Sequence, residues 1–223
     1  MIYVYSAQHD KSRKILMPTA VTLTDVQIQR GQFRIGPLNF TINPSEKIAL
    51  LGSNGCGKSS VLLAIANLLP IQSGNVTRPN AIRLSNGIFS PTPEWTVQET
   101  LRDAVGKNAR AAMAHWRLEE VSRRRLASLS LGFQQRVSLA CATFADADLI
   151  LLDEPANGLD PMQWQQLNDW LNQEMLASAV VVSHQPERLP HSIQRALIID
   201  ETGLQFDGSL SALPAPWPSR VPS

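Results

Sequence analysis

Short, nearly continuous apolar runs recur along the chain and are separated by stretches with a different periodicity. The runs occupy residues 48–51, 149–152, 179–182 and 196–199. Strands that are buried on both faces of a parallel sheet have this pattern, because polar residues do not alternate with the apolar ones. Apolar residues recur at helical spacing between several of the runs, at 59–69, 131–144 and 161–177. This alternation of strands and helices predicts an α/β fold with a parallel sheet.

Two regions depart from this alternation. Residues 21–42 are rich in β-branched and apolar residues broken by glycines, which predicts two or three short strands. Residues 99–129 are charged and helical in pattern, and they indicate a small helical insertion approached through Pro91 and Pro93. We therefore expect four parts, namely an N-terminal extension at 1–19, one domain at 20–208, a helical insertion within it at about 90–129, and a Pro-rich C-terminal tail at 209–223.

Composition narrows the class of protein without naming a function. The chain has 223 residues, of which 43% are hydrophobic, and this is enough for a sizeable core. A formal net charge of +1 gives no reason to expect nucleic acid as an obligate partner. No apolar stretch is long enough to span a membrane, and the first residues lack the apolar core of a secretory signal. Two widely spaced cysteines, Cys56 and Cys141, fit a reducing compartment.

The segment GSNGCGKSS, at residues 52–60, fits the phosphate-binding pattern G-x-x-x-x-G-K-[ST]. An apolar run precedes it and a helical pattern follows it, which is the context that the motif needs. Its glycines allow a tight turn whose N–H groups point inward at the start of a helix, so a phosphate meets donors and positive potential. The predicted nucleotide site consists of Gly52, Ser53, Asn54, Gly55, Cys56, Gly57, Lys58, Ser59 and Ser60.

Three side chains of this segment have predicted roles. Lys58 places a cation on the β- and γ-phosphates, and the Ser59 hydroxyl coordinates Mg²⁺. Cys56 has two interpretations, a redox-sensitive thiol beside the phosphates or a small residue that the loop tolerates. The absence of an evident resolving cysteine favours the second.

Two acids follow the apolar run at 149–152. Asp153 and Glu154 are expected at the carboxyl end of a buried strand, where open α/β sheets bind their ligands. We predict that Asp153 holds Mg²⁺ through water and that Glu154 is the base that polarises the attacking water. Adjacent residues on a strand point to opposite faces, which would give the two carboxylates separate roles. His184 follows another buried run, where it can contact the γ-phosphate and the attacking water.

These motifs follow one another in a specific order. They read GSNGCGKS, SLSLGFQQR, LILLDEP, NGLD and SHQ, within roughly residues 20–208. In this order the sequence resembles the nucleotide-binding subunits of ABC transporters. The resemblance implies a P-loop NTPase with a RecA-like parallel sheet core, an N-terminal antiparallel β-subdomain and a small helical insertion. It also implies ATP as the ligand, Mg²⁺ as the cofactor and ATP hydrolysis as the activity.

The signature motif of that family is altered in this chain. The family usually has L-S-G-G-Q, whereas residues 129–133 read LSLGF and retain Ser130 and Gly132. The resemblance implies two chains facing head to tail, with Ser130 and the Gly132 backbone of one closing over the γ-phosphate held by the other. Leu131 adds bulk at that approach, whereas Phe133 is expected to pack on the core side of its helix. We expect closure to be weakened but active.

Two other family positions lack their usual residue. A glutamine normally follows the strand after the P-loop helix, and Asn86 or Ser85 is the nearest polar match here. An aromatic ring normally stacks on adenine, whereas Arg30 falls near that position in this chain. Arg30 can stack through its guanidinium plane, and Phe33 can supply a ring instead.

The resemblance implies a cytoplasmic ATPase subunit that lies on the cytoplasmic face of a membrane and drives an integral membrane permease. Its second partner would be another ATPase chain, in a homo- or hetero-dimer with Asp160 at the interface. Residues 86–105 would dock a coupling helix of the permease. Two alternatives stay open at this point. One is a pseudo-ATPase or weakly active nucleotide-binding partner in a hetero-dimer. The other, which is less favoured, is a soluble ABC protein acting on the ribosome or DNA.

Overall fold

A six-stranded sheet forms the centre of the computed structural model, which describes residues 20–86, 94–173 and 177–214. Its strands have the order β5-β6-β7-β3-β8-β9, and all neighbours are parallel except β9, which pairs antiparallel with β8. The strands are β3 (Lys47–Leu51), β5 (Ile82–Ser85), β6 (Leu149–Asp153), β7 (Ser178–Val182), β8 (Arg195–Asp200) and β9 (Gly203–Ser209). The four apolar runs coincide with β3, β6, β7 and β8, so the predicted parallel sheet is confirmed.

A three-stranded antiparallel sheet flanks this core, with two of its strands before β3 in the chain and the third after it. It has the order β2-β1-β4 and consists of β1 (Val21–Arg30), β2 (Phe33–Ile42) and β4 (Ser73–Thr77). The strands β1 and β2 form a hairpin in which Arg30 pairs with Phe33 across a turn at Gly31, whose φ is 61°. The predicted N-terminal antiparallel subdomain is therefore confirmed, although its two hairpin strands are longer than the pattern indicated.

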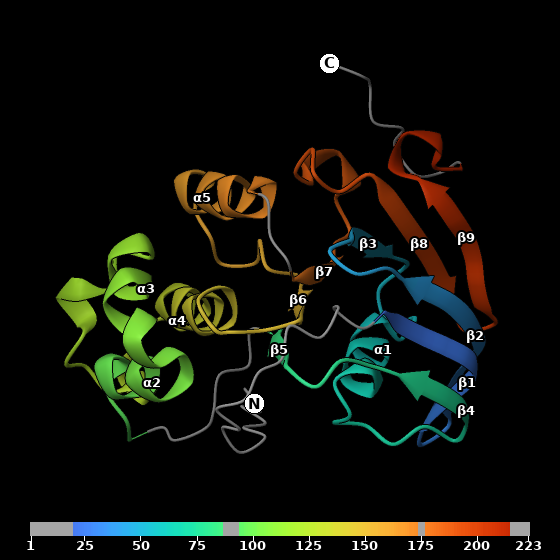
Figure 1. The fold of residues 1–223 in the computed structure, drawn as a ribbon, viewed down its shortest axis with the longest axis horizontal. Coiled ribbons are helices and arrows are strands. Elements are labelled where there is room, and N and C mark those ends of the chain that lie inside the picture. The colour runs from blue at the N-terminus through green and yellow to red at the C-terminus, as the bar shows by residue number, and fades with distance from the viewer. Residues whose placement is uncertain (1–19, 87–93, 174–176, 215–223) are drawn as a thin grey trace.

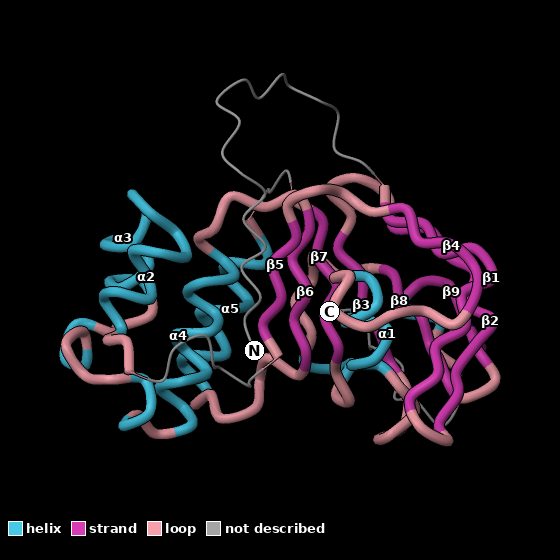
Figure 2. The backbone as a smooth tube through the Cα atoms, turned by 90° about the horizontal axis from the view of Figure 1, so that it is seen from below, coloured by secondary structure: helices cyan, strands magenta, loops and turns pink. Residues whose placement is uncertain are grey.

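The helices lie on both faces of the parallel sheet. They are α1 (Lys58–Ile65), α2 (Val97–Val105), α3 (Ala109–His115), α4 (Leu131–Thr143) and α5 (Pro161–Asn172). Short 3₁₀ turns are η1 (Gly106–Asn108), η2 (Glu119–Val121), η3 (Leu126–Ser128), η4 (Pro186–Arg188) and η5 (Leu210–Ala212). Figures 1 and 2 show α2 to α5 on one side of the sheet and the antiparallel sheet on the other. Helices α2 and α3 belong to the predicted helical insertion, whose approach through Pro91 and Pro93 lies outside the described residues.

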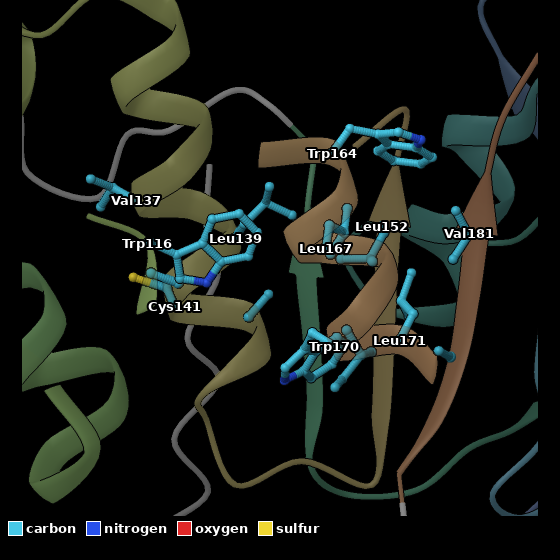
Figure 3. Packing of buried hydrophobic residues seen from close by; sticks show 14 of the residues in the cluster. Trp116, Val137, Leu139, Cys141, Leu152, Trp164, Leu167, Trp170, Leu171 and Val181 are labelled. Carbon is cyan, nitrogen blue, oxygen red and sulfur yellow. The ribbon is translucent and has the colours of Figure 1, made fainter. Parts of the chain in front are cut away.

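Two apolar clusters explain why the strand runs are continuous. On β3, Ala49 and Leu51 belong to the cluster under α2 to α5, whereas Ile48 and Leu50 belong to the cluster around α1 and the antiparallel sheet. Strands β6 and β7 divide their side chains between the clusters in the same way. Figure 3 shows part of the first cluster, where Trp116 lies beside α4 and the α5 side chains Leu167 and Leu171 lie near Leu152 of the sheet. The apolar positions of β3, β6 and β7 are therefore buried on both faces of the sheet, because each face has its own core.

The compact part of the chain continues past the predicted domain end at residue 208. Leu210 and Leu213 are buried, and the Leu210 N–H donates a hydrogen bond to the Gln194 carbonyl at 2.7 Å. The boundaries of the N-terminal extension and of the tail stay predictions. Within the described ranges, no helix is long and apolar enough to cross a membrane.

Candidate functional site

In the loop between β3 and α1, Gly52 and Gly57 combine a positive φ with close neighbours that leave no room for a Cβ. Gly52 and Gly57 have φ values of 155° and 102°. A Cβ at Gly52 would lie 2.5 Å from the Ile199 carbonyl oxygen, and a Cβ at Gly57 would lie 2.9 Å from Cζ of Phe33. The loop is thus wedged between the end of β8 and the start of β2, which fixes its path at the carboxyl edge of the sheet.

Lys58 begins α1 and lies over this loop. Its side chain is buried, and its ammonium donates hydrogen bonds to the carbonyl oxygens of Gly52 at 2.8 Å and Ser53 at 2.9 Å. An ammonium has three N–H donors, so these two contacts leave it able to donate to an anion in the same loop. The helix start adds positive potential at this point.

Asp153, the last residue of β6, faces Lys58 and Ser59. Burial raises the pKa of the Asp153 carboxyl, while the hydrogen bond from Ser59 and the charge of Lys58 act in the opposite direction. A hydroxyl and a carboxylate that meet in this way are hard oxygen ligands of the kind that Mg²⁺ prefers. The described residues contain no group of three or more His, Cys, Asp or Glu side chains placed to hold a metal. The donor set fits an ion held by few protein ligands and completed by phosphate or water oxygens.

Glu154 leaves the strand instead of continuing it. Its φ is 47°, in the left-handed region, and its N–H donates to the Val182 carbonyl of β7 at 3.2 Å. Its carboxylate Oε2 lies 2.8 Å from Nδ1 of His184, which follows β7. The expected reason for separate roles, alternation along one strand, is therefore wrong, because β6 ends at Asp153. A backbone turn separates the two carboxylates.

An open pocket of about 350 Å³ joins most of these residues. It is lined by Arg30, Phe33, Asn54, Gly55, Gly57, Lys58, Ser59, Ser60, Asp153 and Glu154. Both candidates for adenine stacking line it, but they differ in environment. The Phe33 ring packs against Gly57, whereas the Arg30 side chain is exposed.

The Cys56 sulfur lies on the inner side of the phosphate loop. The residue is buried in the cluster around α1, and its Sγ would lie 2.6 Å from a Cβ at Gly52. Its N–H donates to the Ser53 carbonyl at 3.3 Å. This burial favours the interpretation of Cys56 as a residue that the loop tolerates for its size.

The signature segment lies apart from this pocket within the chain. Ser130 caps α4, and its Oγ accepts a hydrogen bond from the Phe133 N–H at 3.5 Å. A Cβ at Gly132 would lie 3.0 Å from the Gly158 carbonyl, so the first turn of α4 packs against the loop after Glu154. Leu131 is 80% exposed. The structure therefore presents Ser130 and Leu131 outward, and neither residue lines the pocket of its own chain.

Phe133 packs in part against the core, as expected, and the Arg136 guanidinium lies 4.0 Å from its ring centroid. Asp160 caps α5 and accepts a hydrogen bond from the Gln163 N–H at 2.8 Å. Its carboxylate therefore stabilises its own helix, and its placement at a dimer interface stays a prediction.

Two buried polar residues of α4 are absent from the sequence-based site. Gln135 donates from Nε2 to the Pro155 carbonyl at 3.3 Å, and the Ser138 hydroxyl lies 2.8 Å from the Ser85 hydroxyl. Ser85 is therefore a core residue, and Asn86 is the polar residue that follows β5. Polar residues three apart on an otherwise apolar helix face are a signal that could have identified Gln135 and Ser138.

Comparison with known protein families decides the family. The family model described as ABC transporter matches residues 35–157. The chain belongs to the ABC transporter family. The expected P-loop NTPase fold is thereby confirmed, and domains of this family bind ATP.

Individual relatives agree with this assignment. The chain is 32% identical over 188 residues to the ABC transporter ATP-binding protein ARB1 of Saccharomyces cerevisiae, with 78% of this chain and 30% of that protein covered. It is 30% identical over 221 residues to the Nod factor export ATP-binding protein I of Sinorhizobium fredii, with 87% of this chain and 64% of that protein covered. The chain thus spans less than two thirds of either relative.

A solved structure of an ATP-binding subunit of an ABC transporter has a similar fold. Its TM-score is 0.76 at 22% identity, and the match covers 86% of this chain and 91% of that chain. At this identity the likeness concerns the fold alone.

Proposed function

We propose that this chain is the ATP-binding subunit of an ABC transporter and that it hydrolyses MgATP to power an integral membrane permease. The observation that carries the proposal is the Glu154–His184 contact of 2.8 Å at the edge of the Lys58 pocket. A carboxylate and an imidazole at this place supply a base beside a phosphate-binding loop.

Binding of the triphosphate would use the loop amides and Lys58. The Lys58 ammonium lies within the loop and can donate to β- and γ-phosphate oxygens. Ser59 and Asp153 would hold Mg²⁺, which when bound neutralises developing phosphate charge. Arg30 or Phe33 would contact the adenine at the pocket rim.

Glu154 would act as the base, and His184 would hold it in place. An ionised carboxylate only accepts hydrogen bonds, so His184 donates its Nδ1–H to Oε2 of Glu154. The second carboxylate oxygen then accepts a proton from the attacking water. In the neutral ring, Nε2 of His184 is an acceptor, and on protonation it becomes a donor toward a phosphate oxygen.

The outward placement of the signature turn supports a second chain as partner. Ser130 caps α4, Gly132 lies in its first turn, and Leu131 is exposed between them. We propose that this turn closes over the nucleotide of another ATPase chain facing head to tail, in a homo- or hetero-dimer. The assembly would lie on the cytoplasmic face of a membrane, with no nucleic acid as partner.

The test combines turnover with capture of partners. Wild type should hydrolyse ATP, and Glu154→Gln should lose about 100- to 10,000-fold in kcat while it still binds MgATP. Tagged Glu154→Gln, held with MgATP and extracted from membranes in mild detergent, should retain a polytopic membrane protein. If the wild-type chain in the same membrane complex binds nucleotide without turnover, and Glu154→Gln changes neither property, the pseudo-ATPase would be supported instead. Recovery of ribosomes or DNA without a membrane protein would contradict the transporter assignment.

A further inference from the structure

Helix α4 carries a polar side chain in an unusual place. Gln135 is 4% exposed and lies one turn beyond the signature residues, on the side of the helix that faces the parallel sheet. Burial of an amide costs free energy unless it is hydrogen-bonded, so the contact that it makes is expected to be specific.

The partner of Gln135 is the backbone directly after Glu154. Its Nε2 donates a hydrogen bond to the Pro155 carbonyl at 3.3 Å. Proline has no N–H, so its carbonyl is the only backbone group through which this residue can be held by a hydrogen bond. The amide of Gln135 therefore fixes the chain at the residue that follows the proposed base.

Glu154 is held from both sides in a conformation that it does not favour. Its own N–H donates to the Val182 carbonyl, and its carbonyl accepts from the Asn157 N–H at 3.0 Å. Its φ of 47° persists only because such contacts enforce it. Loss of the Gln135 contact removes the one side-chain hydrogen bond that the described residues make to the Pro155 backbone.

We propose that Gln135 is a positioning residue for Glu154. By holding the Pro155 carbonyl, it keeps the left-handed turn at Glu154 and so keeps the carboxylate against His184. This inference rests on the proposed hydrolysis. It adds that α4 connects the exposed signature turn to the base of the same chain, over the short distance from Ser130 to Gln135.

Two substitutions of Gln135 test its hydrogen-bond donor while keeping a side chain of similar volume. Gln135→Met keeps an unbranched side chain of similar size but cannot donate, so kcat should fall at least about tenfold, as small misplacements of catalytic groups do. KM for ATP should stay within about twofold, because Gln135 is not among the residues that line the pocket around Lys58. Gln135→Glu can donate only when its carboxyl is protonated, so its kcat relative to wild type should rise as the pH is lowered.

Thr143→Val is the matched control. Thr143 lies on α4, is buried, and accepts a hydrogen bond from the Trp116 indole N–H at 3.1 Å, far along the helix from Pro155. Its replacement also removes a buried hydrogen bond, but kcat should stay within about twofold of wild type. The ring resonances of His184 should shift in Gln135→Met and stay in place in Thr143→Val, since they report the Glu154 contact.

The outcomes distinguish the two proposals. Wild-type kcat in Gln135→Met, or an equal loss in Thr143→Val, would overturn the positioning role and leave hydrolysis standing. Absence of turnover in wild type with its membrane partner would contradict the proposed hydrolysis. In that case the His184 resonances still test whether Gln135 positions Glu154. Unshifted His184 resonances in Gln135→Met would overturn the positioning role as well.

Discussion

The left-handed backbone of Glu154 predicts that this residue reduces the stability of the fold. Its φ is 47°, where a side chain crowds the following carbonyl at a cost of roughly 1–2 kcal/mol. Glycine avoids this cost but gives the unfolded chain more freedom, which is worth roughly 0.5–1 kcal/mol in the opposite direction. Glu154→Gly should therefore be more stable than Glu154→Ala by about 0.5–1 kcal/mol.

Alanine is the proper comparison because both variants lose the carboxylate and its contact with His184. They differ only in the Cβ, so their difference measures the backbone cost. For a chain of this length, 1 kcal/mol corresponds to about 2–4 °C in Tm, so Glu154→Gly should melt about 1–4 °C above Glu154→Ala. Urea unfolding at equilibrium gives the same difference as a free energy.

Asp169 supplies the control pair. It is exposed within α5, where the backbone is helical, so Asp169→Ala should be more stable than Asp169→Gly by about 0.5–1 kcal/mol. The sign of the Gly–Ala difference should therefore reverse between the two positions. If Glu154→Ala equals or exceeds Glu154→Gly in stability while the Asp169 pair behaves normally, the strain argument is refuted.

Three further predictions concern other residues of the site and its core. Burial raises the pKa of Asp153 above its value in the unfolded chain. The protonated carboxyl therefore favours the folded state at pH values below the unfolded-state pKa, and this stabilisation is lost as the pH rises through the folded-state pKa. Without Mg²⁺, Asp153→Asn should thus lose less stability than wild type between acid and neutral pH, and identical melting profiles would contradict this. Gly52→Ala should weaken binding of a fluorescent ATP analogue at least about tenfold by steric clash with the end of β8. Gly55→Ala carries the backbone strain of a φ of 82° but has no atom within 4 Å of its Cβ, so it should retain more affinity than Gly52→Ala. Burial raises the pKa of Cys141 to about 12, so it should resist maleimide at pH 8 in the folded protein and react in urea; rapid labelling of the folded chain at Cys141 would disprove its burial.

The buried strands were predictable because their environment leaves a direct pattern in the sequence. Each residue at 149–152 and 179–182 belongs to one apolar cluster or the other, so these two apolar runs are unbroken. The phosphate loop was predictable for a similar reason, since its glycines, lysine and serine are adjacent in the chain. Both the buried strands and the phosphate loop are therefore specified by residues that are neighbours in the sequence.

The strands β4 and β9 were not predicted, because neither has a continuous apolar run. Strand β4 is mostly exposed and reads SGNVT, so only its pairing with β1 makes it a strand. Strand β9 alternates between exposed and partly buried positions at the edge of the sheet. Pairing between distant segments is a tertiary effect that overrides weak local preference.

The turn at Glu154 was missed for a different reason. The sequence places two acids after a strand, and a simple continuation of the strand gives them opposite directions. The structure turns the backbone at Glu154, where the hydrogen bonds of Glu154 and Pro155 come from Val182, Asn157 and Gln135. Two of these residues are far from Glu154 in sequence, so no local pattern reports them.

The altered signature lies at the N-terminus of α4, and the following residues of this helix keep their contacts with the loop after Glu154. Leu131 is exposed, while Gly132 still packs against the Gly158 loop and Gln135 still holds the Pro155 carbonyl. A bulky side chain that points outward does not change the arrangement of the residues behind it. Under the proposed function, Leu131 therefore acts on the chain that approaches from outside, and the base of this chain stays assembled. On that proposal, we expect a weakened dimer in which the Glu154–His184 contact of each chain is intact.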